Sequence, residues 1–191
     1  MDAAVTLLTE HGDDSFTLAD VARLAGVSIG SIYGRVDSKD GLIRSVQERE
    51  LARIDSETTA AFSRIATDGR SGLDTVVASA IRTTGRILRS NAGILGPLML
   101  RANSDPVVAA AGRRSATAME KLYLDTILAR REEILHPDPR VATSWTYVVV
   151  YSVFARYLGL GSSKESAGQG TWRATTANLT EMTVSFLTRP R

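Results

Sequence analysis

The chain has 191 residues, a net charge of +2, a hydrophobic content of 43% and a charged content of 23%, which are ordinary values for a globular protein with one core or two coupled cores. It contains no cysteine, which excludes a disulfide framework and thiol chemistry and fits a reducing cytoplasm. The first residues lack a basic region followed by an apolar segment, and the longest apolar run, 147–155, is far shorter than the roughly 20 residues of a membrane span, so we expect a cytoplasmic protein with no signal peptide and no membrane partner.

The first 26 residues predict two helices separated by a short connection. A first helix is expected to end at His11-Gly12, because glycine favours the point where a chain leaves a helix. Thr17 is a suitable N-cap for the next helix, and Asp20, three residues later, completes the pattern of a capping box. Gly26 then stands where a positive φ is needed to end that helix. The apolar residues that recur on one face of it are Leu18, Val21, Ala22 and Ala25.

A second short helix is expected directly after a tight turn. Ser28 is its predicted N-cap, and the helix extends from Ile29 to about Val36. Val27 is expected to fill the core of the turn, while Ile32 and Val36 face inward. Two helices joined by such a glycine-containing turn are typical of a helix-turn-helix.

The outward side of this second helix predicts contacts with DNA, because a recognition helix reads bases with its N-terminal residues while flanking groups contact phosphates. Ile29 is expected to touch a thymine methyl group, and Gly30 to permit close approach. Tyr33 and Arg35 are expected to contact phosphates. Lys39 stands at the N-terminus of a further helix, a position that suits an anion. The predicted DNA-binding residues are Thr17, Ser28, Ile29, Gly30, Ser31, Tyr33, Gly34, Arg35 and Lys39.

The remaining residues predict only helices, so the fold class is all-α with about nine helices. The predicted helices cover 38–66, 73–90, 94–102, 106–135, 139–160 and 171–188, with an interruption at Gly96-Pro97. Breaks are expected at 68–72, at 91–93, at His136-Pro137 and in the Gly/Ser-rich segment 159–170. No strand pattern of convincing length occurs, and there is no internal repeat.

The N-terminal motifs resemble those of the TetR/AcrR family of one-component transcriptional regulators. The matching stretches are Phe16-Thr17-Leu18-Ala19-Asp20-Val21-Ala22, Ala25-Gly26-Val27-Ser28, Gly30-Ser31-Ile32-Tyr33, and Ser38-Lys39 through Leu42. The resemblance is close over about the first 45 residues, and beyond them it extends only to chain length and helical pattern. Two positions depart from the family: Val36 replaces the usual aromatic residue, and Arg35 replaces the frequent His or Tyr. The family also usually has a basic arm before its first helix, which the first residues here do not provide.

The resemblance implies a three-helix DNA-binding domain at 1–45 and a helical ligand-binding and dimerisation domain at 46–191. It implies a double-stranded DNA operator, an unidentified small-molecule inducer and a homodimer that pairs through the last two helices. The apolar character of 139–160 independently favours a partner for that helix; the alternative is that both helices close the core of a monomer.

A ligand cavity in the second domain is also implied by the resemblance. The candidate lining residues are Phe62, Leu95, Met99, Tyr123, Trp145 and Tyr151. The alternative is that these side chains belong to the core. Arginines near apolar segments favour a neutral or anionic ligand, although solvated arginines explain them equally well.

The most direct functional hypothesis is a repressor that a small molecule releases from its operator, with activation still open. Residues 1–50 carry five basic and nine acidic side chains, whereas residues 51–191 have a balance of +6. A basic patch is the usual mark of DNA binding, so the acidic first fifty residues support an alternative: a helical ligand- or partner-binding protein with weak or lost DNA affinity. An enzyme is not expected, because the sequence offers no catalytic motif, metal-ligand spacing or cofactor motif, and both histidines stand at helix ends.

Overall fold

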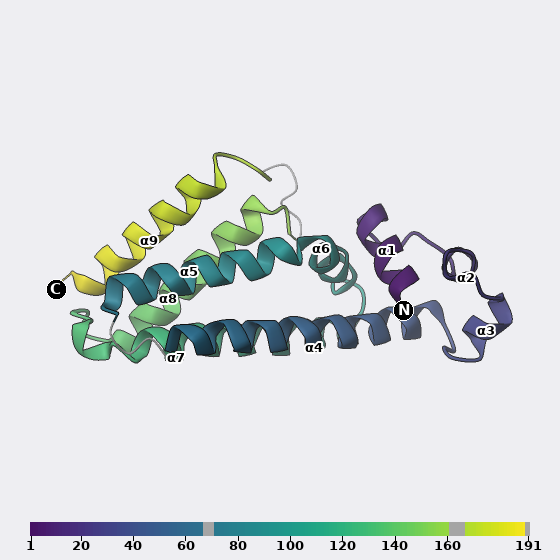
Figure 1. Cartoon of the computed structure of the whole chain (residues 1–191), viewed down its shortest axis with the longest axis horizontal. Coiled ribbons are helices and arrows are strands. Elements are labelled where there is room, and N and C mark those ends of the chain that lie inside the picture. The colour runs from purple at the N-terminus through teal and green to yellow at the C-terminus, as the bar shows by residue number, and fades with distance from the viewer. Residues whose placement is uncertain (67–70, 161–166, 190–191) are drawn as a thin grey trace.

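The computed structural model describes residues 1–66, 71–160 and 167–189, and this part of the chain forms nine α-helices, one short 3-10 helix and no strand (Figure 1). The predicted all-α class is therefore confirmed. The helices are α1 (Asp2–His11), α2 (Leu18–Ala25), α3 (Ile29–Tyr33), α4 (Lys39–Ala66), α5 (Leu73–Ser90), α6 (Ala92–Arg101), α7 (Pro106–Leu128), η1 (Arg131–Glu133), α8 (Pro139–Tyr157) and α9 (Trp172–Thr188).

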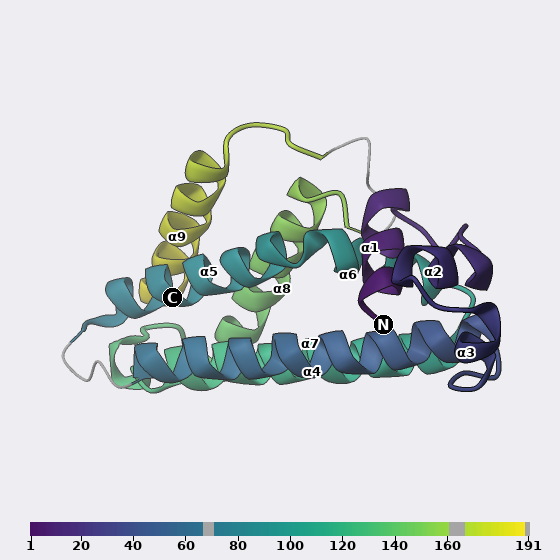
Figure 2. The ribbon, with the colours of Figure 1, turned by 45° about the vertical axis from the view of Figure 1, so that its right-hand side comes forward.

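The molecule is elongated, with helices α1–α3 at one end of its long axis and the C-terminus at the other (Figure 1). We call α1–α3 with the first turn of α4 the head, and the remainder the body. Helix α4 starts in the head and runs beside α7 along the body. Helices α5 and α8 pack against this pair, and α9 packs against α5 and α8 (Figure 2). Helix α6 packs against α1 and α7, so it lies where head and body meet. None of the described helices is both long and apolar enough to cross a membrane.

The head follows the predicted capping pattern. Helix α1 ends at Gly12, with φ of 73°. The Thr17 hydroxyl accepts a hydrogen bond from the backbone N–H of Asp20 at 3.2 Å, and the Asp20 carboxylate accepts one from the backbone N–H of Thr17 at 2.9 Å. These reciprocal bonds satisfy two N–H groups that a helix start leaves free. The prediction for the turn itself is wrong in one respect: Val27 is 42% exposed and does not fill the core, and Ala25 is exposed as well.

Helices α4 and α7 lie side by side in the same direction and in a constant register. Arg44 contacts Asp105, Gln47 contacts Val108, and Asp55 contacts Ser115. Each contact joins positions 60 or 61 residues apart, so the two helices are aligned over about three turns. Because α4 is one continuous helix across residue 45, the two expected domains share it.

Helix boundaries in the body confirm some predictions and correct others. Helix α5 has the predicted bounds, whereas α6 starts at Ala92 and continues through Pro97, so the interruption expected there is wrong. Helix α7 ends at Leu128 rather than near residue 135. The chain turns there because two side chains reach back to the start of α5: the Glu133 carboxylate accepts a hydrogen bond from the N–H of Leu73 at 2.8 Å, and Arg130 donates to the Ser71 carbonyl. The predicted loops at 68–72 and 159–170 lie largely outside the described residues.

Gly26→Ala is expected to lower the free energy of unfolding by about 1–2 kcal/mol, because Gly26 has a φ of 66° that L-residues adopt only at a cost. No atom lies within 4 Å of the position that a Cβ would occupy there, so the cost is purely one of backbone conformation. Urea denaturation followed by circular dichroism measures it. Gly30→Ala is the matched control: Gly30 is helical and its Cβ would have room, so this change should not lower stability. Equal midpoints for Gly26→Ala and the unchanged protein would contradict the assignment.

Candidate functional site

Helix α3 is short and lies entirely at the surface of the head. It begins after Ser28, whose hydroxyl accepts a hydrogen bond from the backbone N–H of Ser31 at 3.2 Å, and it ends at Tyr33. The helix is therefore three residues shorter than predicted, although the N–H of Val36 still bonds to the Ile32 carbonyl at 3.0 Å and continues the turn. None of its residues is buried. Ile32 and Val36 pack against the core with part of their surface, as predicted.

The exposed residues of α3, with Ser28 before it and Gly34 and Arg35 after it, form a surface of the head that we call the α3 face. Tyr33 is 59% exposed and Ile29 is 42% exposed. Arg35 is also exposed and donates one hydrogen bond to the Ser31 carbonyl at 3.1 Å, which leaves the rest of its guanidinium for other acceptors. The remaining predicted residues on this surface are Ser28, Gly30 and Gly34, which are exposed, and Ser31, which is half-buried. Thr17, the N-cap of α2, is exposed as well. Leu24 and Val27 add exposed apolar surface beside the α2–α3 turn, and the helical pattern had not singled out Leu24.

Lys39 takes a different position from the predicted one. Its ammonium donates a hydrogen bond to the backbone carbonyl of Asp14 and lies 5.2 Å from the centre of the Phe16 ring. Both contacts hold the α1–α2 connection against the start of α4, so Lys39 is half-buried and does not stand free at the helix N-terminus. An ammonium has three N–H groups, and those not used by Asp14 can still meet an anion.

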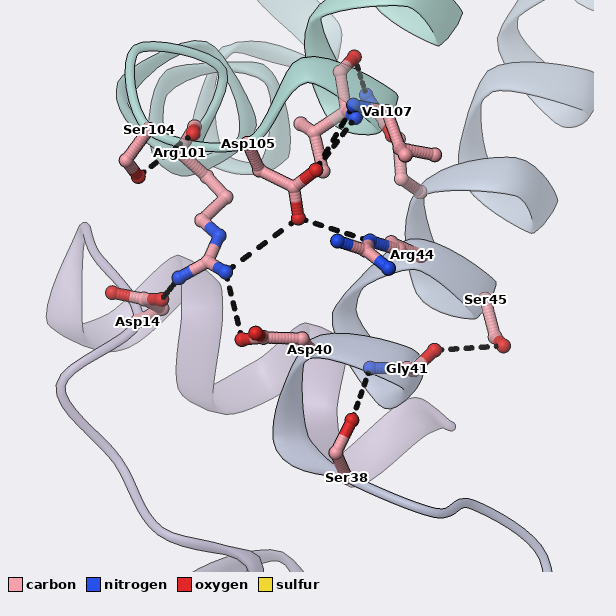
Figure 3. Close-up of polar contacts among 12 residues, drawn as sticks. Asp14, Ser38, Asp40, Gly41, Arg44, Ser45, Arg101, Ser104, Asp105 and Val107 are labelled. Carbon is pink, nitrogen blue, oxygen red and sulfur yellow. Dashed lines mark hydrogen bonds and ion pairs between the residues drawn. The ribbon is translucent and has the colours of Figure 1, made fainter.

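The head is joined to the body by a cluster of charged side chains, which we call the Arg101 cluster: Asp14, Asp40, Arg44, Arg101 and Asp105 (Figure 3). The guanidinium of Arg101, at the end of α6, bonds Asp14 at 2.9 Å and Asp40 at 2.7 Å. It also lies 3.5 Å from Asp105, which Arg44 contacts at 3.0 Å. The Nε of Arg101 is buried without a hydrogen-bond partner in the described part of the chain. A single arginine of α6 therefore connects the α1–α2 loop and the start of α4.

Asp105 is the centre of this cluster on the body side. It is 2% exposed, and its carboxylate accepts hydrogen bonds from the N–H groups of Val107 at 3.0 Å and Val108 at 3.3 Å, so it is also the N-cap of α7. The hydrogen bond from Arg44 lowers the pKa of Asp105, and the backbone N–H groups act in the same direction although burial opposes them. The carboxylate is therefore charged at neutral pH.

A cavity of about 410 Å³ lies between α4, α6 and α7, directly beside the Arg101 cluster. Its wall is mainly aliphatic and includes Leu95, Met99 and Tyr151, three of the predicted lining residues. The other three predicted residues do not line this cavity. Phe62 is 1% exposed and Tyr123 is fully buried, both within the core cluster away from the cavity wall, and Trp145 is 61% exposed on the outer side of α8.

Trp145 belongs instead to an apolar surface that α8 and α9 share, which we call the α8–α9 face. Its large exposed apolar side chains are Val141, Trp145, Val148, Val149, Met182 and Phe186. A groove of about 530 Å³ runs along this face and is lined on one side by His136, whose ring lies 5.2 Å from that of Phe186. Contiguous apolar surface of this kind marks an interaction site in proteins.

The acidic and histidine side chains of the described residues form no metal-ligand group. No group of three or more His, Cys, Asp or Glu side chains there is placed to hold a metal ion. His11 has a structural contact, since its Nδ1 lies 3.2 Å from the Ser15 hydroxyl beside the end of α1. His136 receives a hydrogen bond from the N–H of Asp138 at 3.1 Å.

Comparison with known proteins identifies the head. Residues 1–46 match the family model for bacterial regulatory proteins of the tetR family. This range contains α1–α3 and the whole α3 face, and it ends inside α4. No curated protein sequence matches the chain.

Several solved structures share the fold of the whole chain. The fatty acid degradation regulator FadR from Bacillus halodurans is 17% identical with a TM-score of 0.69, covering 100% of this chain and 94% of its own. A protein from Mesorhizobium loti MAFF303099 assigned to the TetR-family transcriptional regulators is 16% identical with a TM-score of 0.74, covering 97% and 92%. FadR from Bacillus subtilis in complex with stearoyl-CoA is 15% identical with a TM-score of 0.68, covering 97% and 96%. At these identities the likeness establishes the fold.

Proposed function

We infer that this chain, which carries the DNA-binding domain of the tetR family and the fold of its regulators, is a ligand-responsive transcriptional regulator. The observation that carries this inference is the α3 face: a helix with no buried residue, capped by Ser28, in which Ile29, Gly30 and Tyr33 are exposed. A helix in this position after a glycine turn fits the major groove of DNA. We propose 1–45 as the DNA-binding domain and 46–191 as the domain that binds ligand and partner.

Different residues of the α3 face are proposed to have different tasks. Ile29, near the N-terminus of α3, would make apolar contact with a thymine methyl group, and Gly30 would let the helix backbone approach the bases. Tyr33 and Arg35 would donate hydrogen bonds to phosphates, which position the protein without reading sequence. Thr17 and Ser28 already use their hydroxyls as helix caps, so a role for them in DNA contact is secondary.

We propose that the chain acts as a homodimer and as a repressor. The α8–α9 face supports dimerisation, because a two-fold partner would cover the exposed apolar side chains of both copies. Two heads in one dimer would contact successive major grooves about 34 Å apart. The proposed ligand site is the cavity between α4, α6 and α7. FadR from Bacillus subtilis was solved with stearoyl-CoA bound, which supports a mainly apolar ligand for the same fold here.

DNA binding is tested by fluorescence anisotropy with fragments selected from genomic DNA. Tyr33→Phe, which removes only the hydroxyl, is expected to weaken all sequences alike by about tenfold, the value of one hydrogen bond to a charged group. Gly30→Ala should weaken binding without lowering stability, since its Cβ has room within the protein. Tyr157→Phe, at the end of α8 and outside the head, is the matched control and should bind as the unchanged chain does.

The same experiment decides the alternative function. The first fifty residues have nine acidic and five basic side chains, and two of the basic ones, Arg35 and Lys39, already have partners within the head. A chain that binds no genomic fragment at low salt would be a helical ligand- or partner-binding protein that has lost DNA affinity.

A further inference from the structure

The cavity beside the Arg101 cluster owes its space to small residues on α7. Ala109, Gly112 and Ala116 stand on successive turns of that helix and face the cavity. Opposite them, Leu51 and Ile54 of α4 provide aliphatic surface, and α6 contributes further aliphatic side chains on another side. A volume of about 410 Å³ is in the range of sites for small organic molecules. The body of a fitting ligand is therefore hydrocarbon.

Gln47 places a polar group with an unused acceptor in this apolar wall. Its side chain is 3% exposed and lines the cavity. The amide N–H₂ donates to the Val108 carbonyl at 2.9 Å, which fixes which end of the amide is oxygen. Within the described residues the amide oxygen accepts no hydrogen bond, and it is not fully enclosed by protein atoms, so it borders the open space of the cavity. A ligand that offers an O–H or N–H group would satisfy it.

Arg113 places an unpaired positive charge at the rim of the cavity. It is the one charged side chain in the wall, it is exposed, and within the described ranges no carboxylate lies close enough to form an ion pair with it. No Asp or Glu lines the cavity at all. This arrangement favours an anionic group on the ligand and penalises a cationic one.

The Gln47 amide and the Arg113 guanidinium are separated along the cavity. Gln47 is level with Val108, and Arg113 lies five residues further along α7, which is about 7.5 Å along the helix axis. Tyr151 adds a hydroxyl without a hydrogen-bond partner in the described chain, and burial raises its pKa, so it remains a neutral donor. The donor and the anion of a ligand would thus be spaced along its hydrocarbon body and not adjacent.

We propose that the cavity binds a hydroxylated apolar anion: a hydrocarbon body whose anionic group meets Arg113 and whose hydroxyl, several carbon atoms away, donates to Gln47. This inference rests on the proposed ligand response and adds the chemical class of the ligand. The anion can be a free carboxylate or the phosphates of an acyl-CoA thioester, and the experiment separates these two sources.

The test is direct calorimetric titration of the full chain, without DNA, using four matched ten-carbon probes: 10-hydroxydecanoate, decanoate, 1,10-decanediol and decanol. The hydroxyl should strengthen carboxylate binding by about fivefold, the value of one hydrogen bond. The carboxylate should strengthen binding relative to the corresponding alcohol by a similar factor or more. 10-Hydroxydecanoyl-CoA is the fifth probe, and tighter binding of it than of the free acid would assign the anion to the CoA phosphates.

Two variants assign the effects to the proposed residues. Gln47→Leu should remove the preference for 10-hydroxydecanoate over decanoate, while the preference for decanoate over decanol should remain. Arg113→Gln should remove the preference for carboxylates over alcohols. Arg114→Gln is the matched control, since Arg114 is the next residue, is exposed and does not line the cavity. Thermal unfolding of each variant verifies that it is folded.

The outcomes separate this inference from the proposed function. Equal affinity for carboxylates and alcohols, an unchanged preference in Arg113→Gln, or no binding of any probe would each overturn the ligand class, even if the chain binds DNA. Carboxylate binding by a chain that never binds DNA would support the ligand class and overturn the regulator.

Discussion

Trp145→Glu is expected to convert the protein into a monomer and to weaken DNA binding by about 100-fold or more, because two linked heads gain affinity by avidity that a single head lacks. Trp145 is 61% exposed and lies in the middle of the α8–α9 face. A charge there would have to lose its water when a second copy covers the face. The fold of the monomer should survive, since the side chain is largely in water already.

Sedimentation velocity at micromolar concentration and fluorescence anisotropy with operator fragments measure the two effects. Val107→Glu is the control, because Val107 is 53% exposed at the start of α7, outside the α8–α9 face. It should leave both the dimer and DNA binding unchanged. A dimer of unchanged stability in Trp145→Glu would mean that the α8–α9 face is not the contact between subunits.

Among single substitutions in the Arg101 cluster, Asp105→Ala is expected to destabilise the fold most. It removes the N-cap of α7 and also leaves Arg44 and Arg101 without their shared carboxylate. Asp138→Ala is the matched control, because Asp138 caps α8 through the N–H of Val141 at 3.0 Å but forms no ion pair in the described chain. The control should cost about 1 kcal/mol, the typical value of a cap. Asp105→Ala should lower the free energy of unfolding by about two to three times as much, because the charges of Arg44 and Arg101 would lose their buried partner.

The loss of stability in Asp105→Ala should depend on pH and be larger at neutral than at acidic pH. Because the folded state lowers the pKa of Asp105, this group contributes stability above its ordinary pKa of about 4, and the contribution disappears as the pH falls through the folded pKa. The difference in thermal midpoint between Asp105→Ala and the unchanged chain should therefore be full at pH 7 and narrow below pH 4. Equal destabilisation by Asp105→Ala and Asp138→Ala at pH 7 would show that only the cap matters.

The sequence predicted most of what depends on neighbouring residues. Helix ends are marked by residues whose contacts lie within three or four positions, namely Thr17 with Asp20, Gly26 and Ser28. Such local contacts can be predicted from the sequence alone. The end of α7 was missed because Glu133 and Arg130 bond residues about 60 positions away, at the start of α5. Those bonds override the helix-forming tendency of 129–135.

The same distinction between local pattern and tertiary packing applies to the residues expected at the ligand and DNA sites. Trp145 and Phe62 resemble cavity residues by type, and only the packing shows that one faces outward and the other lies in the core. The ion pairs of the Arg101 cluster could not be predicted for a related reason: Asp14 and Asp40 lie 87 and 61 positions from Arg101 in the sequence. The contacts of Lys39 with the carbonyl of Asp14 and the ring of Phe16 were likewise not readable from the sequence, because they depend on how the α1–α2 connection packs against α4.

The continuity of α4 has a mechanical consequence for gene control. The helix has 28 residues and is therefore about 42 Å long, and the same stiff rod bears Gln47 and Ile54 in the cavity wall and Asp40 at its head end. If a ligand in the cavity rotated α4 by only about 5° around its C-terminal end, the N-terminal end would move by about 4 Å, because the helix is so long. This displacement exceeds the rise of one base pair, about 3.4 Å. A rotation too small to disturb the packing of the body would therefore be enough to move α3 out of register with the major groove.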